Sequence, residues 1–193
     1  MLFVSLRRRR LIIKNSRYVI FGLISIFLMI FPSKKVHATD YTKETGYVLQ
    51  ILIPATALAL TYAKGDNQGS IQFYKSFATT MAATYALKYS VPETRPDGTD
   101  NKSFISGHTS AAFSGASFIQ RRYGWKLGIV AYAAASFTGW SRIESKKHYL
   151  GDVARGAAIG IISTYIFTSP YNGVTIQAFA DRDTYGINLL TSW

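Results

Sequence analysis

Long apolar segments separated by short polar breaks follow one another from Asp40 to about Pro170. Apolar residues recur in them at helical spacing, and glycine or proline stands at the breaks, which predicts helices rather than strands. Polar stretches at Val91–Ser103 and Ser141–Gly151 are expected to be loops. The expected helices are Tyr47–Ala63, Ile71–Tyr89, about Ser106 to Arg122, Trp125–Trp140 and Asp152–Thr168. We therefore expect an all-α helical bundle of about five helices.

The last residues of the chain change pattern. Residues 174–179 and 185–189 alternate with period two around a polar break, which predicts a β-hairpin within 171–193. Because a lone hairpin is marginally stable in water, we expect it to pack against the helices or a partner.

The N-terminal segment is typical of an export signal. Basic residues precede the 14-residue apolar run Tyr18–Phe31, and Val36-His37-Ala38 follows as a small-x-small cleavage site before Thr39. The run is shorter than the ~20 residues that span a bilayer, which favours cleavage, whereas Lys34 and Lys35 favour an uncleaved anchor. The expected domains are thus a signal peptide or anchor at 1–38, a helical domain at 39–170 and a hairpin tail at 171–193.

Charge and composition exclude several classes of function. Residues 1–38 hold eight of the 22 Lys and Arg residues and no acidic residue, so the net charge of +12 falls to +4 for the rest. This argues against a nucleic-acid partner. The chain has no cysteine, which excludes disulfides, thiolate metal sites and cysteine nucleophiles.

The apolar segments leave the relation to a membrane open. Each is only about 16 to 19 residues long and carries polar residues such as Gln50, Lys75, Lys126 and Arg155. Membrane-spanning helices and the buried helices of a soluble bundle both fit this pattern.

Two histidines stand in polar breaks between the expected helices. Ser106-Gly107-His108 opens a helix, where free N–H groups attract an anion and His108 can transfer a proton; the alternative is a serine N-cap beside an incidental histidine. His148 precedes Asp152 by four residues, so the carboxylate can orient the imidazole, whereas the alternative has Asp152 capping a helix that starts at Val153.

Three cations accompany these histidines along the chain. Lys88 and Arg95 flank the end of the second expected helix, and Arg142 precedes His148 by six residues. Cations at a helix end are usually a solvated rim. Together, however, these three could hold the oxygens of one phosphate group.

In this order, Lys88-x6-Arg95-Pro96, Ser106-Gly107-His108 and Ser141-Arg142-x5-His148-x3-Asp152 resemble the three-part signature of the type 2 phosphatidic acid phosphatase superfamily. That superfamily also contains class A acid phosphatases and vanadium haloperoxidases. With the flanking helices, the resemblance covers about residues 47–168. It departs from the usual pattern at Ile105, where the family usually has proline.

The resemblance implies a role for each matching residue. His148 would be the nucleophile that forms a phosphohistidine, Asp152 would orient it, and His108 would act as acid and then as base. The phosphate-binding residues it implies are Lys88, Arg95, Ser106, Gly107 and Arg142. It implies no metal and no cofactor, because fixed cations supply the charge that phosphoryl transfer needs.

The implied function is a phosphatase acting on a phosphomonoester or pyrophosphate. The apolar segments favour a lipid phosphate and a membrane-associated enzyme. The alternatives are a soluble periplasmic acid phosphatase of broad specificity and, as the weaker one, a vanadium-dependent haloperoxidase. The expected place is the bacterial cell envelope, at the periplasmic face of the inner membrane or in the periplasm.

Overall fold

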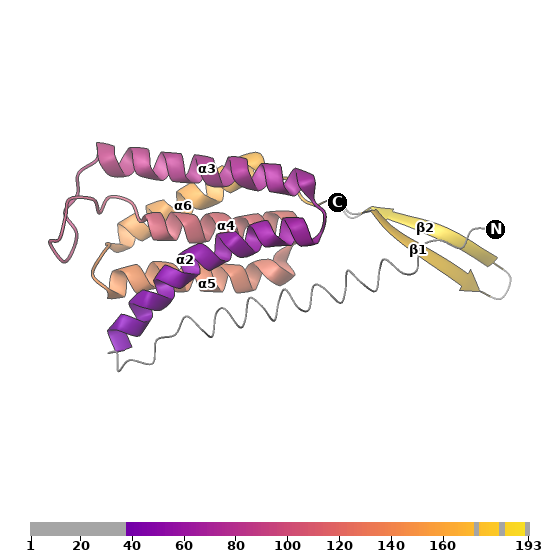
Figure 1. Ribbon diagram of the computed structural model, residues 1–193, viewed down its shortest axis with the longest axis horizontal. Coiled ribbons are helices and arrows are strands. Elements are labelled where there is room, and N and C mark those ends of the chain that lie inside the picture. The colour runs from indigo at the N-terminus through magenta and orange to yellow at the C-terminus, as the bar shows by residue number, and fades with distance from the viewer. Residues whose placement is uncertain (1–37, 172–173, 182–183, 192–193) are drawn as a thin grey trace. The chain divides into compact units, whose positions relative to one another are not determined.

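The computed structural model describes residues 38–171, 174–181 and 184–191. Residues 38–171 form a helical bundle, so the prediction of a helical bundle is confirmed for this range (Figure 1). The helices are α2 (Ala38–Ala63), α3 (Asn67–Ser90), α4 (Gly107–Tyr123), α5 (Trp125–Glu144) and α6 (Leu150–Phe167). Residues 1–37 of the predicted signal segment lie outside the described residues, and its last residue, Ala38, is the first residue of α2.

Helix α4 is the centre of the bundle and contacts each of the four other helices. Small residues on α4, among them Ala112, Ser114 and Ala116, are fully buried. They let its neighbours approach closely: a Cβ added at Gly160 of α6 would lie 2.6 Å from the carbonyl oxygen of Ser110. The central position of α4 follows from its lack of large side chains.

Two helix boundaries differ from the sequence prediction in ways that matter for the site. Helix α5 continues four residues past Trp140, so Ser141 and Arg142 lie in its last turns and not in a loop. Helix α6 begins at Leu150, and its N-cap is Tyr149. Asp152 is therefore not an N-cap residue, and that alternative is wrong. Ser141, Arg142 and Asp152 are all buried, which their polarity does not indicate.

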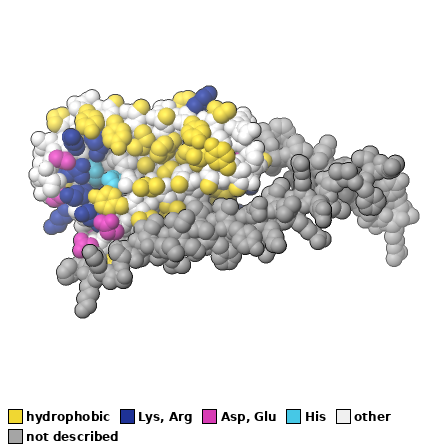
Figure 2. Space-filling model, in the orientation of Figure 1, with side chains coloured by type: hydrophobic (Ala, Val, Ile, Leu, Met, Phe, Trp, Pro, Cys, Tyr) yellow, Lys and Arg dark blue, Asp and Glu magenta, His cyan; other side chains and the backbone are white. Residues whose placement is uncertain are grey.

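Large apolar side chains lie mostly on the outside of the bundle, and small polar ones lie inside. Ile51, Val130 and Leu150 are about two thirds exposed. Buried hydroxyl residues include Ser76, Thr80, Ser114, Thr138 and Thr164. Figure 2 shows apolar side chains along the length of the bundle on the face in view. Small and hydroxyl residues between helices are characteristic of bundles in lipid.

Of the helices in the described part of the chain, two segments, Asp40–Ala63 and Leu150–Phe167, are long and apolar enough to cross a membrane. This is weak support for a membrane location, since the core helices of a soluble protein pass the same test.

The tail contains β1 (Val174–Asp181) and β2 (Thr184–Thr191). The two strands pair antiparallel, with Val174 opposite Thr191 and Asp181 opposite Thr184. Packing of this tail against the helices or a partner stays a prediction.

Candidate active site

One end of the bundle collects the ends of four helices, and the residues singled out in the sequence lie there. Figure 2 shows histidine side chains among Lys and Arg side chains at that end. The last turn of α3 carries Lys88, and the loop after it carries Arg95. Helix α4 begins at Gly107, so Ser106 and His108 flank its first residue. The last turn of α5 contributes Arg142, the α5–α6 connection contributes His148, and the first turn of α6 contributes Asp152.

His148 is held through its Nδ1 atom. This atom lies 3.0 Å from the carbonyl oxygen of Ser103 and 3.4 Å from Oδ2 of Asp152. Since a carbonyl oxygen only accepts, Nδ1 carries the proton and donates it to Ser103. The other ring nitrogen, Nε2, is then unprotonated in the neutral imidazole and is available as a nucleophile or base. Ser103 shares with Asp152 the orienting role that the sequence assigned to Asp152 alone.

Asp152 is completely buried and has several donors around its carboxylate. Its Oδ2 accepts from the Ser103 hydroxyl at 2.5 Å and from the Tyr149 backbone N–H at 2.9 Å. Its Oδ1 accepts from Nη1 of Arg155 at 2.9 Å. These hydrogen bonds fix the direction of the carboxylate.

The contact of Arg155 with the Asp152 carboxylate was not predicted from the sequence. Nη1 of Arg155 also donates to the carbonyl of Phe104, the guanidinium lies 4.3 Å from the centre of the Phe104 ring, and Glu93 lies within 3.4 Å. The available signal was an arginine three residues after Asp152 in an otherwise apolar helix. Arg155 thus joins α6 to the loop that precedes α4.

Arg142 is 1% exposed and lies against α2. Its Nη2 donates to the Lys43 carbonyl at 2.7 Å, and its Nε lies 3.1 Å from Oγ of Ser141. The guanidinium is 4.4 Å from the centre of the Tyr47 ring, and that ring meets the imidazole of His108 edge-on at 4.9 Å. Tyr47 was not singled out in the sequence, because nothing local distinguishes it from the other apolar residues of its helix.

The remaining cations come from the loop side of the site. Lys88 donates to the carbonyl of Lys102 at 3.2 Å, and Arg95 pairs with Asp100 at 2.6 Å. Burial, followed by the positive charge of Arg95, lowers the pKa of Lys88. The Arg95 side chain is therefore pre-positioned by an acidic neighbour in its own loop.

This loop is tied to the connection between α5 and α6. Asp97 pairs with Lys147 at 2.5 Å, and its backbone N–H donates to the Lys146 carbonyl at 3.1 Å. The loop that carries Arg95 and the connection that carries His148 consequently form one wall of the site.

Ser106 is the N-cap of α4, as one of the two sequence interpretations had it. Its Oγ accepts from the backbone N–H of Thr109 at 3.4 Å and from the Thr109 hydroxyl at 2.8 Å. The N–H groups of Gly107 and His108, in the first helical turn, have no intrahelical acceptor. These two N–H groups, and not the buried Ser106 hydroxyl, are the clearer donors for an anion.

The two imidazoles share one electrostatic environment. Burial, and then the charges of Arg142, His148, Lys88 and Arg95, lower the pKa of His108 to about 3. Burial, and then Lys88 and Arg95, lower the pKa of His148 to about 4. The positive charges of Lys88 and Arg95 thus act on both rings, and both histidines are neutral at pH 7 without a bound anion.

Among the part of the chain that the structure describes, no group of three or more His, Asp or Glu side chains is placed to hold a metal ion. The cations Lys88, Arg95 and Arg142 are instead the groups at this end of the bundle that suit the oxygens of an oxyanion.

Buried histidines and fixed cations gathered at one end of a helical bundle suit the handling of phosphate groups. The family model described as PAP2 superfamily matches residues 70–174, which contain all eight candidate site residues. The chain belongs to the PAP2 superfamily.

Known proteins resemble this chain to different extents. A lipid A 1-phosphatase of Porphyromonas gingivalis is 43% identical over 96 residues, which are 44% of this chain and 22% of that protein. The chain thus spans about a fifth of that relative's length. A lipid A 4'-phosphatase of Helicobacter pylori is 29% identical over 162 residues, 77% of this chain and 81% of that protein.

Among solved structures, the crystal structure of Aquifex aeolicus LpxE shares the fold. Its TM-score is 0.59 at 20% sequence identity, and the match covers 74% of this chain and 92% of that chain.

Proposed function

We propose that this protein is a phosphatase that hydrolyses a phosphomonoester, or a pyrophosphate, on a lipid. The observation that carries the proposal is that an oriented His148 and the cations Lys88, Arg95 and Arg142 lie at one end of the bundle, where the Tyr47 ring contacts both Arg142 and His108. Phosphoryl transfer needs in-line placement and stabilisation of charge on the equatorial oxygens more than covalent help from the protein.

In the first step, Nε2 of His148 attacks phosphorus. The bond from phosphorus to the leaving oxygen breaks, and His108 donates a proton to that oxygen. Asp152 and the Ser103 carbonyl stabilise the positive charge that develops on the His148 ring. The three cations and the Gly107 N–H hold the phosphoryl oxygens, and Ser106 supports this cradle by capping α4.

In the second step, water replaces the enzyme on phosphorus. His108, now neutral, takes a proton from the water, the water oxygen attacks phosphorus, and the bond from phosphorus to Nε2 of His148 breaks. Inorganic phosphate leaves, and His148 returns to its neutral form. The role of His108 as acid requires that the bound substrate raise its pKa, which the negative charge of a phosphate among these cations does.

The surface of the bundle supports a lipid substrate. Large apolar side chains are exposed along its length, and a cleft of about 370 Å³ between α2 and α5 is lined almost entirely by apolar residues, from Leu49 to Leu60 on α2. Helix α2 lines the cleft from Leu49 onward and also contributes Tyr47, whose ring contacts His108. An acyl chain could therefore lie along the bundle while its phosphate occupies the site.

The relatives that are lipid A phosphatases make phosphorylated lipid A the first substrate to test. Export by the N-terminal segment would place the site at the periplasmic face of the inner membrane. The scheme fits this location, because it uses neither ATP nor a cytosolic cofactor.

The test is phosphate release by the full-length protein in detergent. The substrates are lipid A, phosphatidic acid, a polyprenyl pyrophosphate and a soluble aryl phosphate, each with wild type and His148→Ala. We expect release from at least one lipid and none with His148→Ala. Equal activity of folded His148→Ala would overturn the mechanism, and preference for the soluble ester would favour the periplasmic acid phosphatase instead.

A further inference from the structure

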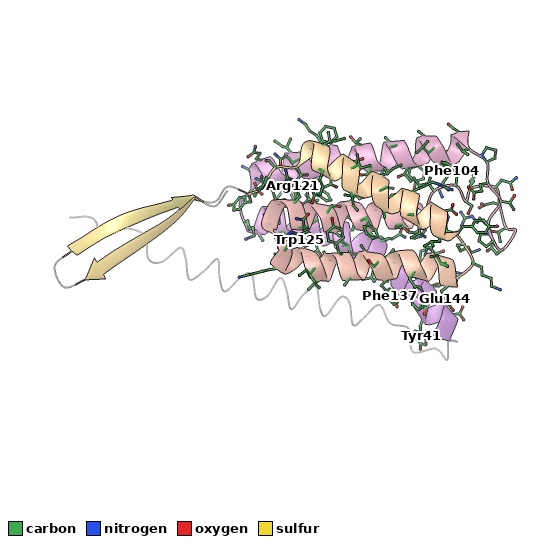
Figure 3. All side chains as sticks on the ribbon, turned by 180° about the vertical axis from the view of Figure 1, so that it is seen from behind. Tyr41, Phe104, Arg121, Trp125, Phe137 and Glu144 are labelled. Carbon is green, nitrogen blue, oxygen red and sulfur yellow. The ribbon has the colours of Figure 1, made fainter. Side chains whose placement is uncertain are left out.

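A second basic pocket lies at the other end of the bundle. It has a volume of about 430 Å³, and its lining includes Lys64, Arg121, Arg122, Tyr123 and Tyr171. Figure 3 shows Arg121 and Trp125 at the end of the bundle opposite Phe104 and Glu144. Because α4 runs from the active site to this pocket, the two are about 24 Å apart by its helical rise.

One of the three cations of this pocket is neutralised by a buried acid. Arg122 binds Asp66 through Nη2 at 2.6 Å and through Nε at 2.8 Å, and both side chains are 3% exposed. The Tyr123 hydroxyl donates to the same carboxylate at 2.9 Å, and Nη1 of Arg122 donates to the carbonyls of Ser169 and Pro170. Arg122 and Tyr123 are thus both hydrogen-bonded to Asp66, and they form one fixed wall of the pocket.

The other two cations, Lys64 and Arg121, are not neutralised in this way. Among the described residues, neither Lys64 nor Arg121 forms an ion pair with a carboxylate. Nζ of Lys64 lies 5.4 Å from the centre of the Tyr123 ring and 6.0 Å from that of Tyr171. Arg121 lies 5.1 Å from the Tyr165 ring and donates to the Thr168 carbonyl at 3.2 Å. Aromatic rings and a backbone carbonyl therefore position Lys64 and Arg121 without neutralising their positive charge.

We propose that this pocket binds a phosphate-bearing anion, in the first place the phosphodiester headgroup of an anionic phospholipid. The assignment rests on the proposed function in one respect: a lipid phosphatase whose helices cross the membrane has its two ends at opposite leaflets. The pocket volume is within the range of small-ligand sites, about 300–1,000 Å³. Two uncancelled cations beside tyrosine rings match a headgroup that is anionic above an apolar tail.

The pocket is separate in kind from the active site. No histidine is among the residues that line it, so it offers no nucleophile of the kind found at the other end. Its predicted role is binding without hydrolysis, which would hold the bundle at a fixed depth in the leaflet opposite the active site.

Native mass spectrometry of the full-length protein in neutral detergent tests the proposal. The probes are dioleoylphosphatidylglycerol and, as the zwitterionic comparison, dioleoylphosphatidylcholine. We expect wild type to retain the anionic lipid preferentially, and Lys64→Ala/Arg121→Ala to retain at least about fivefold less of it. Lys75→Ala, which removes a cation of α3 that does not line this pocket, is the matched control. Lys88→Ala removes a cation from the active site instead, and both controls should retain the lipid.

Millimolar inorganic phosphate added to the complex distinguishes the two sources of the ligand. Displacement of the lipid identifies the phosphate group alone as the ligand, whereas retention identifies the lipid headgroup. The proposal fails if wild type retains both lipids equally, if the double variant retains the anionic lipid as wild type does, or if only Lys88→Ala loses it. Lys64→Gln/Arg121→Gln, with the same melting temperature as wild type, guards against a loss caused by misfolding.

This readout is independent of catalysis. A protein that releases no phosphate from any substrate can still retain phosphatidylglycerol through this pocket, and an active phosphatase can fail to retain it. The failure of the pocket and the failure of the proposed function are therefore distinguishable.

Discussion

Nδ1 of His148 lies 3.4 Å from Oδ2 of Asp152, although His148 stands before the N-cap of the helix that carries Asp152 in its first turn. The pair is not a helical i, i+4 contact. It forms because the Asp152 side chain turns back to accept from the backbone N–H of Tyr149, at the residue that follows His148. Capping the helix and orienting the histidine are thus performed by the same oxygen.

Replacing Asp152 by Asn tests the charge of this pair apart from its shape. The amide is isosteric, but it cannot stabilise the imidazolium that forms on His148, so we expect kcat to fall by about 10²- to 10⁴-fold. The measurement is steady-state phosphate release at pH 7. Asp40→Asn, on the exposed first turn of α2, is the control and should behave as wild type. A loss below about threefold in Asp152→Asn would contradict the assigned role.

Arg155 is predicted to act as a positioning residue through Asp152. Arg155→Gln removes a charged hydrogen bond to Oδ1, which is worth about 1.5–3 kcal/mol, so we expect kcat to fall by about 10- to 100-fold with little change in KM. Arg155→Lys should recover part of the rate. An effect confined to KM, or to the melting temperature, would mean that Arg155 only supports the fold.

Tyr47 links Arg142 and His108, so its ring is expected to matter more than its hydroxyl. Tyr47→Leu removes the contact between the ring face and the Arg142 guanidinium. A contact of this kind is worth about 1–2 kcal/mol, so we expect kcat/KM to fall by about 5- to 30-fold. Tyr47→Phe keeps the ring and should keep most of the activity. If Phe is as damaging as Leu, the hydroxyl carries the effect and the ring does not.

The low pKa values of the histidines predict how stability depends on pH. In the folded protein the pKa values are about 3 for His108 and about 4 for His148, whereas an unfolded histidine has a pKa near 6.5. Between these values the unfolded chain binds more protons, so the free energy of unfolding falls as pH decreases from about 6.5 to 4. Each histidine contributes at most about 1.4 kcal/mol per pH unit.

Denaturation of the detergent-solubilised protein at pH 4.5 and 7 measures this difference. His108→Gln and His148→Gln should each make the free energy of unfolding less dependent on pH.

Nuclear magnetic resonance of labelled histidine tests the effect of a bound anion on the pKa of His108. Vanadate bound among the cations should raise the pKa of His108 by about 1–3, since an opposite charge favours the protonated ring. An unchanged pKa would mean that the anion binds elsewhere.

In the proposed mechanism, Lys and Arg side chains rather than a metal ion bind the phosphoryl oxygens. This predicts how the enzyme responds to chelators and to oxyanions. Dialysis against EDTA should leave phosphate release within about twofold of the untreated enzyme, and vanadate should inhibit competitively. Activity that EDTA removes and a divalent ion restores would show that a metal takes part. Halide oxidation on adding vanadate would instead support the haloperoxidase alternative.

Local signals in the chain were sufficient for most helix positions. Ser106 caps α4 as its residue type suggests, and Gly124, with a φ of 90°, separates α4 from α5 between the two predicted helices. The same signals were insufficient at the end of α5, where Ser141 and Arg142 look like the start of a polar loop. They remain helical because α2 packs on them so closely that a Cβ at Gly46 would lie 2.0 Å from Oγ of Ser141.

The sequence by itself determined the helical class and the order of the helices, because periodicity is a local property of the chain, and its motif spacing with the family resemblance singled out the eight candidate site residues. Only the tertiary structure decided which groups surround those residues: the Ser103 carbonyl on His148, Arg155 on Asp152 and the Tyr47 ring on Arg142. These contacts join segments whose separation along the chain carries no periodic signal. They exist because helices packed through small residues bring their ends together at one end of the bundle.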